Sequence, residues 1–161
     1  MKIIGIDPGY DRLGIAVIEN GTLLYSDCFT TSAKADFYDR LRMVAEEVQR
    51  VMDKYKPDAF AIESLYMTKN QKTAMRVAEA RGVIVCEAAW RHIPIYEYTP
   101  GQIKVAVTGH GGSDKVQVTK MIPLLVKMPK NSDKEKRYDD EYDAIAVALT
   151  CEAHEKGTKK R

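Results

Sequence analysis

The hydrophobic pattern at the start of the chain predicts three strands joined by two turns. Residues 2–7 form an almost uninterrupted apolar run that ends on Asp7, and such runs are typical of strands covered on both faces. A Pro-Gly pair then ends the strand. Apolar positions recur over 13–18 and 23–28, and the Asn-Gly pair at 20–21 is a strong signal for a two-residue hairpin between them.

The rest of the chain alternates helices with two further strands. Apolar residues spaced three and four apart predict an amphipathic helix over 34–54, with Thr31 or Ser32 as its N-cap. A short buried strand over 59–62 follows and ends on Glu63. The later elements are expected, in order, to be a helix over 70–90, an edge strand over 92–98, and helices over 99–109, 113–127 and 140–154, with Pro123 kinking or shortening the second of these three. This order predicts an α/β fold in which helices flank both faces of a mixed five-stranded sheet.

Length and composition fit a single domain with its own core. The chain has 161 residues, of which 45% are hydrophobic and 30% are charged. We expect one domain over 1–155 and a basic, disordered tail over 156–161. We expect neither a membrane-spanning helix nor a signal peptide, because no apolar run is long enough to span a membrane and acids interrupt the first apolar stretch. The three cysteines have no metal-like spacing, which is typical of a cytoplasmic protein with reduced thiols.

Four carboxylates stand out by their positions. Asp7 and Glu63 end two apolar strands, and Asp140 and Asp143 share one face of the last helix because they are three residues apart. A right-handed crossover through the first helix would place the two strands side by side, so that both acids emerge at one edge of the sheet. Clustered carboxylates repel each other, and a hard cation such as Mg²⁺ or Mn²⁺ resolves the repulsion. Two such ions about 4 Å apart can cleave a phosphodiester by activating water and stabilising the leaving oxygen.

Each of these acids also has an ordinary structural explanation when it is taken alone. Asp7 can form a turn before Pro-Gly, and Glu63 can pair with a lysine. Asp140 and Asp143 can be helix N-terminal acids that the macrodipole favours. Taken together these explanations are weaker, because it is costly to bury an unpaired acid at the end of an apolar strand.

Five segments, in order along nearly the whole chain, carry a family resemblance. They are GIDPG at 5–9, Glu63 with YMTKN at 66–70, EARGVI at 79–84, YTPGQIKVAVTGHGGSDKVQV at 98–118, and DEYDAIAVAL at 140–149. With these segments the chain resembles the RuvC-type Holliday junction resolvases of the RNase H-like (retroviral integrase) superfamily. The charged loop over 128–138 departs from typical bacterial members and is similar to bacteriophage-type relatives.

The resemblance implies an RNase H-like fold and a homodimeric, Mg²⁺-dependent endonuclease that nicks two opposing strands of a four-way DNA junction. It implies two ions per active site, with Mn²⁺ able to substitute, and it admits branch-migration helper proteins as further partners. The implied catalytic, metal-binding acids are Asp7, Glu63, Asp140 and Asp143, and Asp139 competes with Asp140 for the third place. Lys104 and Lys115 match the basic positions of the family, and Lys104 is counted with the catalytic residues.

The residues expected to contact DNA are basic, aromatic or small. Lysines and arginines can neutralise phosphates, an aromatic can stack on a splayed base, and a glycine loop lets backbone amides approach a phosphate. A solvated charged face, a half-buried loop aromatic and a simple turn are the alternatives. The set consists of Tyr66, Lys69, Lys72, Arg76, Arg81, Lys104, Gly111, Gly112, Ser113 and Lys115.

Two broader questions stay open at the level of sequence. Small residues at steps of four, Ala74, Ala78 and Gly82, form either a dimer face or a surface that packs on its own sheet. Two other functions also fit the chain: a nuclease with wider targets such as flaps and forks, and a catalytically silent junction-binding protein.

Overall fold

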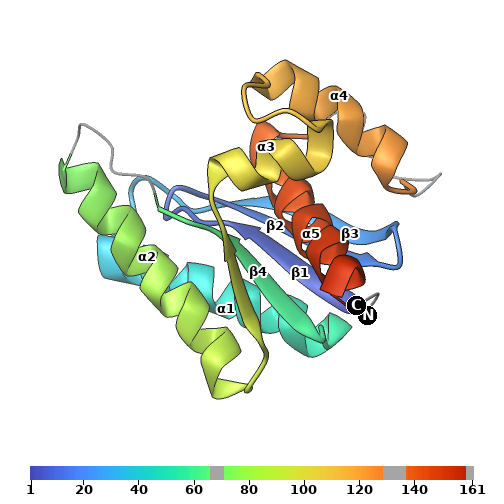
Figure 1. Cartoon of the computed structure of the whole chain (residues 1–161). Coiled ribbons are helices and arrows are strands. Elements are labelled where there is room, and N and C mark those ends of the chain that lie inside the picture. The colour runs from blue at the N-terminus through green and yellow to red at the C-terminus, as the bar shows by residue number, and fades with distance from the viewer. Residues whose placement is uncertain (66–70, 129–136, 159–161) are drawn as a thin grey trace.

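The computed structural model describes residues 1–65, 71–128 and 137–158, and it confirms the α/β fold with a mixed five-stranded sheet (Figure 1). The strand order is β3-β2-β1-β4-β5. In chain order the elements are β1 (Lys2–Asp7), β2 (Arg12–Glu19), β3 (Thr22–Thr30), α1 (Phe37–Tyr55), β4 (Ala59–Glu63), α2 (Gln71–Trp90), β5 (Ile95–Tyr98), α3 (Pro100–Thr108), α4 (Lys115–Leu125) and α5 (Asp139–Thr158). No helix in the described ranges is long and apolar enough to cross a membrane.

The pairing of the central strands brings two of the predicted acids to one edge. Strand β1 runs antiparallel to β2 and parallel to β4, as the right-handed crossover predicts. Ile6 pairs with Ile62, so the next residue on each strand is an acid, Asp7 on β1 and Glu63 on β4. Both carboxylates therefore leave the sheet at the carboxyl ends of neighbouring parallel strands.

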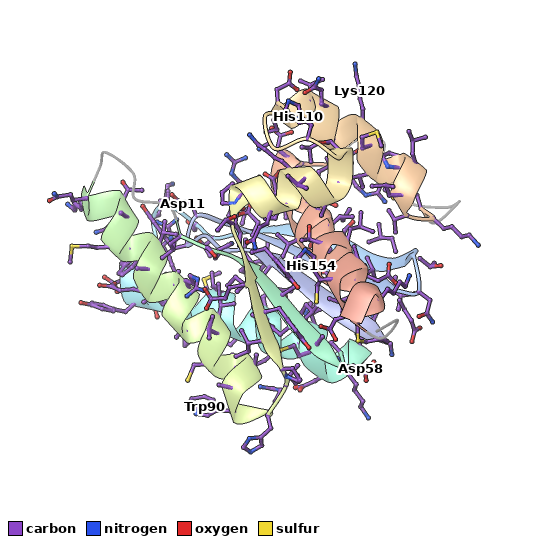
Figure 2. All side chains as sticks on the ribbon, in the orientation of Figure 1. Asp11, Asp58, Trp90, His110, Lys120 and His154 are labelled. Atoms are coloured by element: carbon purple, nitrogen blue, oxygen red, sulfur yellow. The ribbon has the colours of Figure 1, made fainter. Side chains whose placement is uncertain are left out.

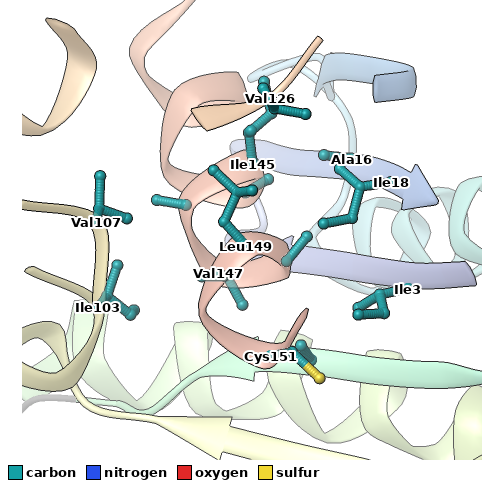
Figure 3. Packing of buried hydrophobic residues seen from close by; sticks show 14 of the residues in the cluster. Ile3, Ala16, Ile18, Ile103, Val107, Val126, Ile145, Val147, Leu149 and Cys151 are labelled. Carbon is teal, nitrogen blue, oxygen red and sulfur yellow. The ribbon is translucent and has the colours of Figure 1, made fainter. Parts of the chain in front are cut away.

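Each face of the sheet has its own hydrophobic core. Helices α1 and α2 cover one face, where Ile4 and Ile6 of β1 pack with the apolar side of α1. Helix α5 covers the other face, and α3 and α4 pack against it (Figure 1). On that side Ile145 and Leu149 of α5 lie over the strands (Figure 3). Because β1 is buried on both faces, its sequence is a continuous apolar run rather than an alternating one.

At two glycine positions the backbone of helix α5 lies directly against the sheet, with no side chain between them. A Cβ added at Gly14 of β2 would lie 2.0 Å from the backbone oxygen of Asp140, and one added at Gly5 would lie 2.3 Å from the oxygen of Ala144. Such distances leave no room for any residue but glycine at these two strand positions. This close approach places the first turn of α5 directly over the end of β1.

Helix α1 begins later than its sequence pattern predicts, and its cap is a different residue. Asp36 is the N-cap, and its side chain accepts a hydrogen bond from the backbone N–H of Tyr38. Thr31 is instead buried, where its hydroxyl donates to the backbone oxygen of Tyr10 and accepts from Nε of Arg40. The prediction of Thr31 or Ser32 as the cap was wrong because this tertiary contact takes the threonine hydroxyl.

The later helices match their sequence signals with smaller differences. Thr99 caps α3 and Gly109 ends it in the left-handed region, as predicted. Asp114 caps α4, which contains Pro123 and ends at Leu125, before the expected residue 127. Helix α5 begins at Asp139 and runs on to Thr158, so the segment expected as a disordered tail is helical over 156–158.

Candidate active site

Four carboxylates from three elements approach one another at the carboxyl end of the central strands. Asp7 comes from β1, Glu63 from β4, and Asp140 and Asp143 from the first turns of α5. Asp7 lies next to the start of α5. Gly14 shows this, since a Cβ added there would lie 3.0 Å from Cβ of Asp7 and 2.0 Å from the backbone oxygen of Asp140. The predicted grouping of strand-end acids with helix acids is present in the fold.

The charges of these acids act strongly on Asp7. Burial, followed by the negative charges of Asp143, Glu63 and Asp140, raises the pKa of Asp7 to about 8. Burial and the charge of Asp143 also raise the pKa of Glu63. The pKa of Asp143 is raised mainly by burial, although Lys115 opposes this effect. Raised pKa values caused by burial and by neighbouring acids are a common feature of functional sites.

Lys115 is the basic residue that reaches furthest into the acid cluster. Its Nζ lies 2.9 Å from Oδ2 of Asp143 and 3.7 Å from Oδ2 of Asp139. It is the first residue of α4, and the Asp114 cap with its reciprocal Gln117 contact fixes the start of that helix. The ammonium group therefore provides part of the positive charge that the clustered acids require.

Asp140 and Asp139 occupy different surroundings although they are adjacent in sequence. Asp140 has 22% of its side chain exposed and lies 3.5 Å from a guanidinium nitrogen of Arg12. It also accepts a hydrogen bond from the thiol of Cys28 at 3.7 Å. Asp139 is 74% exposed, and its carboxylate lies 3.7 Å from Nζ of Lys115. Of the two candidates for the third acidic position, Asp140 is the one whose charge acts on Asp7.

Two hollows lie beside the acids and are lined by basic residues. One cavity of about 190 Å³ has Glu63 and Asp143 on one side and Lys104 and Lys115 on another, with Pro100, Ile103, Val118 and Ala146 completing its wall. A second, of about 430 Å³, is lined by Arg12, Lys115, Arg137, Tyr138, Asp139 and Asp140. Cations therefore lie beside the acids in both cavities, an arrangement that suits a phosphate-containing substrate.

The donor chemistry of the acid cluster fits a hard divalent cation. Carboxylate oxygens are the ligands that Mg²⁺ and Mn²⁺ prefer, and three neighbouring acids add to the effect of burial in raising the pKa of Asp7. Across the described residues, no three acidic, histidine or cysteine side chains are close enough together to enclose a metal ion as they stand. The ammonium of Lys115 contacts Asp143 instead, so closure of the four acids around an ion requires side-chain adjustment.

The structure separates the residues that were expected to contact DNA. Tyr66 and Lys69 lie outside the described residues. Lys72 is exposed at the start of α2, whereas the guanidinium of Arg76 lies 4.8 Å from the ring centre of Phe37. Arg81 points to β5, where it forms an ion pair with Glu97 at 2.6 Å. Lys104 and Lys115 are thus the two members of the set that line a cavity together with the acids.

The glycine segment lies in the turn between α3 and α4. Gly111 and Gly112 are exposed, and the turn also carries His110 (Figure 2). Ser113 is buried, and its hydroxyl shares a 2.7 Å hydrogen bond with the hydroxyl of Thr108. The serine side chain therefore stabilises the turn, while the two glycines remain open to solvent.

The stripe of small residues on α2 does not pack on the sheet. Ala78 and Gly82 are exposed, and a Cβ added at Gly82 would meet nothing within 4 Å. The same helix buries its opposite side through Ala80, Ile84 and Ala88. Of the two interpretations of the stripe, packing against its own sheet is excluded for Ala78 and Gly82.

Reasoning from the sequence missed Arg12, Cys28, Glu141 and Arg137. Arg12 follows the turn after Asp7, and a basic residue just beyond a strand-end acid was a usable signal. Cys28 and the buried Glu141 gave no such signal, because a strand cysteine and a helix N-terminal glutamate are common in ordinary positions. Arg137 belongs to a charged segment that resembled a solvated loop.

Comparison with known proteins agrees with this geometry. The family model described as crossover junction endodeoxyribonuclease RuvC matches residues 3–151. The proteins of that name from Thermosipho melanesiensis and Roseiflexus sp. are 48% and 42% identical to this chain, each over 92% of it and over 94% and 88% of their own lengths.

Solved structures show the same relationship. The structure of Thermus thermophilus RuvC in complex with a Holliday junction substrate has a TM-score of 0.89 at 28% identity, covering 98% of this chain and 96% of that one. The yeast mitochondrial Holliday junction resolvase shares the fold at 15% identity, with a TM-score of 0.68 and coverage of 98% and 81%. The chain therefore belongs to the RuvC family of crossover junction endodeoxyribonucleases.

Proposed function

We propose that this protein resolves four-way DNA junctions as a divalent-metal-dependent endonuclease. The observation that carries the proposal is the meeting of Asp7, Glu63, Asp140 and Asp143 beside a cavity lined by Lys104 and Lys115. Membership in the RuvC family supports the reaction, and the related T. thermophilus structure with a Holliday junction substrate supports the substrate.

The four acids are the proposed ligands of the metal. We assign two ions per site, with Mg²⁺ as the natural cation and Mn²⁺ as a substitute, because the donor set consists of oxygens alone. When bound, the ions supply a nucleophilic water and charge stabilisation for the leaving oxygen. Without a cation the cluster is held by protons and by Lys115, as the raised pKa of Asp7 and the contact with Asp143 indicate.

The surrounding residues bind and orient the DNA backbone in this proposal. Lys104 and Lys115 contact phosphates at or next to the scissile bond, because they line the same cavity as Glu63 and Asp143. Lys72 and Arg76 at the start of α2, and the amides of Gly111 and Gly112, are proposed for more distant phosphates. Ser113 supports the turn that presents those glycines. Tyr66 and Lys69 remain candidates for contacts near the junction centre.

A homodimer gives the two nicks their symmetry. Two identical sites related by a two-fold axis match a substrate whose opposing strands have similar symmetry. The exposed stripe of Ala78 and Gly82 on α2 leaves a smooth surface on which a second copy can approach. We place the protein in the cytoplasm as one domain, where its three free thiols stay reduced.

The test is cleavage of a labelled four-way junction in the presence of Mg²⁺, Mn²⁺, Ca²⁺ or EDTA, compared with flaps, forks and linear duplex. We expect paired nicks at symmetric positions on the four-way junction with Mg²⁺ or Mn²⁺, and none with EDTA. Equal cutting of flaps and forks would favour a nuclease with wider targets. Junction binding without nicks under any cation would favour a silent binding protein.

A further inference from the structure

Glu141 is a carboxylate with no exposure to solvent, located between two of the proposed metal ligands in sequence. Its side chain is 0% exposed, although glutamate is seldom fully buried. Oε2 accepts a 3.0 Å hydrogen bond from the hydroxyl of Ser26, and it lies 3.8 Å from Nε of Arg137. Oε1 accepts from the backbone N–H of Tyr138 at 3.3 Å. These contacts bind the first turn of α5 to strand β3 and to the residues just before the helix.

Strand β3 contacts α5 twice in this region. Ser26 and Cys28 are two residues apart, so their side chains lie on the same face of the strand. Ser26 binds Glu141, and the thiol of Cys28 donates to Asp140. Nε of Arg137 also donates to the Ser26 hydroxyl at 3.3 Å, which closes a small network of polar groups. The network therefore ties the first turn of α5 to one face of β3.

From this geometry we propose that Glu141 is a positioning residue for the metal-binding acids. Asp140 and Asp143 belong to the same two turns of helix as Glu141, so a rotation that loosens Glu141 from Ser26 moves both acids relative to Asp7. The glycine contacts at Gly5 and Gly14 set how close α5 lies to the sheet, and its buried apolar residues hold the body of the helix in the core. The Glu141, Ser26 and Arg137 network adds a buried polar restraint at the first turn, where Asp140 and Asp143 lie.

The chain offers a matched control at the other end of the same helix. Glu152 is also a buried carboxylate of α5, with 7% exposure, and it also binds the strand side of the fold. It accepts a 2.9 Å hydrogen bond from the backbone N–H of Gly21 and pairs with Lys156 at 3.1 Å. Glu152 contributes to the stability of α5 as Glu141 does, but it lies several turns away from the acids. If Glu141 had a purely structural role, replacing it would affect Mn²⁺ binding no more than replacing Glu152 does.

The inference rests on the proposed function, because it assigns Glu141 a role toward the acids proposed to hold the metal. The experiment compares wild type with Glu141→Gln, Ser26→Ala, Glu152→Gln and Asp7→Asn in the full-length protein. Three quantities are measured: the rise in melting temperature with Mn²⁺ concentration, the cleavage rate at saturating junction, and the junction affinity in EDTA. The first is a binding measurement that does not depend on catalysis.

We expect Glu141→Gln to require about tenfold or more Mn²⁺ for half of the thermal shift, with a similar fall in cleavage rate at fixed Mn²⁺. Ser26→Ala, which removes one hydrogen bond and leaves the carboxylate in place, is expected to change both quantities in the same direction by a smaller factor. Glu152→Gln is expected to lower the melting temperature in EDTA while its Mn²⁺ dependence stays that of wild type. Junction affinity in EDTA is expected to be unchanged in all three variants.

Wild-type Mn²⁺ dependence in both Glu141→Gln and Ser26→Ala would overturn the positioning role, and so would an equal change in Glu152→Gln. If Glu141→Gln does not fold, Ser26→Ala decides by the same criterion. Failure of the proposed function gives a different result: either wild type cuts no junction, or Asp7→Asn cuts as fast as wild type.

Discussion

Nζ of Lys115 lies 2.9 Å from Oδ2 of Asp143, so a side chain from the start of α4 neutralises an acid from the start of α5. A bound divalent cation would compete with this ammonium for the same carboxylate. Metal binding at the acids should therefore release Lys115 from Asp143, and Lys115 is also proposed to contact a phosphate.

Replacing Lys115 by methionine should separate these two roles. Removing one positive charge beside the acids should tighten the binding of Mn²⁺ to the free protein several-fold, an effect of about 1 kcal/mol. Cleavage should nevertheless fall, because the phosphate loses a cation. Calorimetric titration with Mn²⁺ and single-turnover cleavage measure the two effects. Lys120→Met, on the same helix, removes the same charge at an exposed position and should leave both close to wild type.

Replacing Asp7 by asparagine should remove cleavage while junction binding persists. The carboxylate at the end of β1 is the one on which the other three acids act, and the neutral amide is a poor ligand for a hard cation. We expect the single-turnover rate to fall by about 10³-fold or more. Gel-shift titration in Ca²⁺ reports binding separately. A variant that cut at the wild-type rate would show that Asp7 holds no catalytic ion.

The same substitution should stabilise the metal-free protein near neutral pH. Burial and neighbouring acids raise the pKa of Asp7 to about 8 from 3.8, so the folded state binds a proton that the unfolded state releases earlier. The contribution of Asp7 to stability is therefore fully present below pH 3.8 and is lost as pH rises toward 8.

Thermal unfolding in EDTA, measured from about pH 5 to about pH 8.5, would reveal this loss. Wild type should lose melting temperature with rising pH more steeply than Asp7→Asn, whose side chain does not titrate. Addition of Mn²⁺ at the highest pH should raise the melting temperature of wild type and leave that of the variant almost unchanged. Parallel pH profiles for the two proteins would contradict the assignment of the raised pKa to Asp7.

Replacing Gly14 by alanine tests how α5 lies on the sheet, and the same replacement at Gly82 of α2 is the control. Gly14→Ala places a Cβ 2.0 Å from the backbone oxygen of Asp140, so α5 must move away and stability should fall by about 3 kcal/mol. Gly82→Ala adds a methyl group in open space within a helix and should stabilise the monomer by about 0.5–1 kcal/mol. Urea denaturation measures both. Cleavage should fall for Gly14→Ala beyond what its stability explains, since Asp140 moves with the helix.

Most of the fold could be predicted from the strand patterns in the sequence. The acid after Ile6 and the acid after Ile62 lie at one edge because apolar strands, a crossover helix and parallel pairing leave few alternatives. The two caps Thr99 and Asp114 were readable for a similar reason, since each forms a local pattern with the glutamine three residues later.

What the sequence did not reveal depends on tertiary contacts. Thr31 and Asp36 are both acceptable caps, and only the packing of Arg40 and Tyr10 around Thr31 decides between them. Asp139 and Asp140 are equivalent until the rotation of α5 is known. Glu141 resembled a helix N-terminal acid in water, because nothing near it in the sequence indicates the hydroxyl of Ser26 on a distant strand.

The close packing of α5 on Gly5 and Gly14 has a consequence for the protein during its synthesis. Asp7 precedes Asp143 by most of the length of the fold, so the two acids cannot meet until the segment that forms α5 has been synthesised. Until α5 docks on β1 and β2, the nascent chain has only two of the four proposed ligands and lacks the restraint proposed for Glu141. On the proposed assignment of the metal-binding acids, a partial product that lacks α5 should therefore not cut DNA, and a truncation that removes α5 should have the same effect.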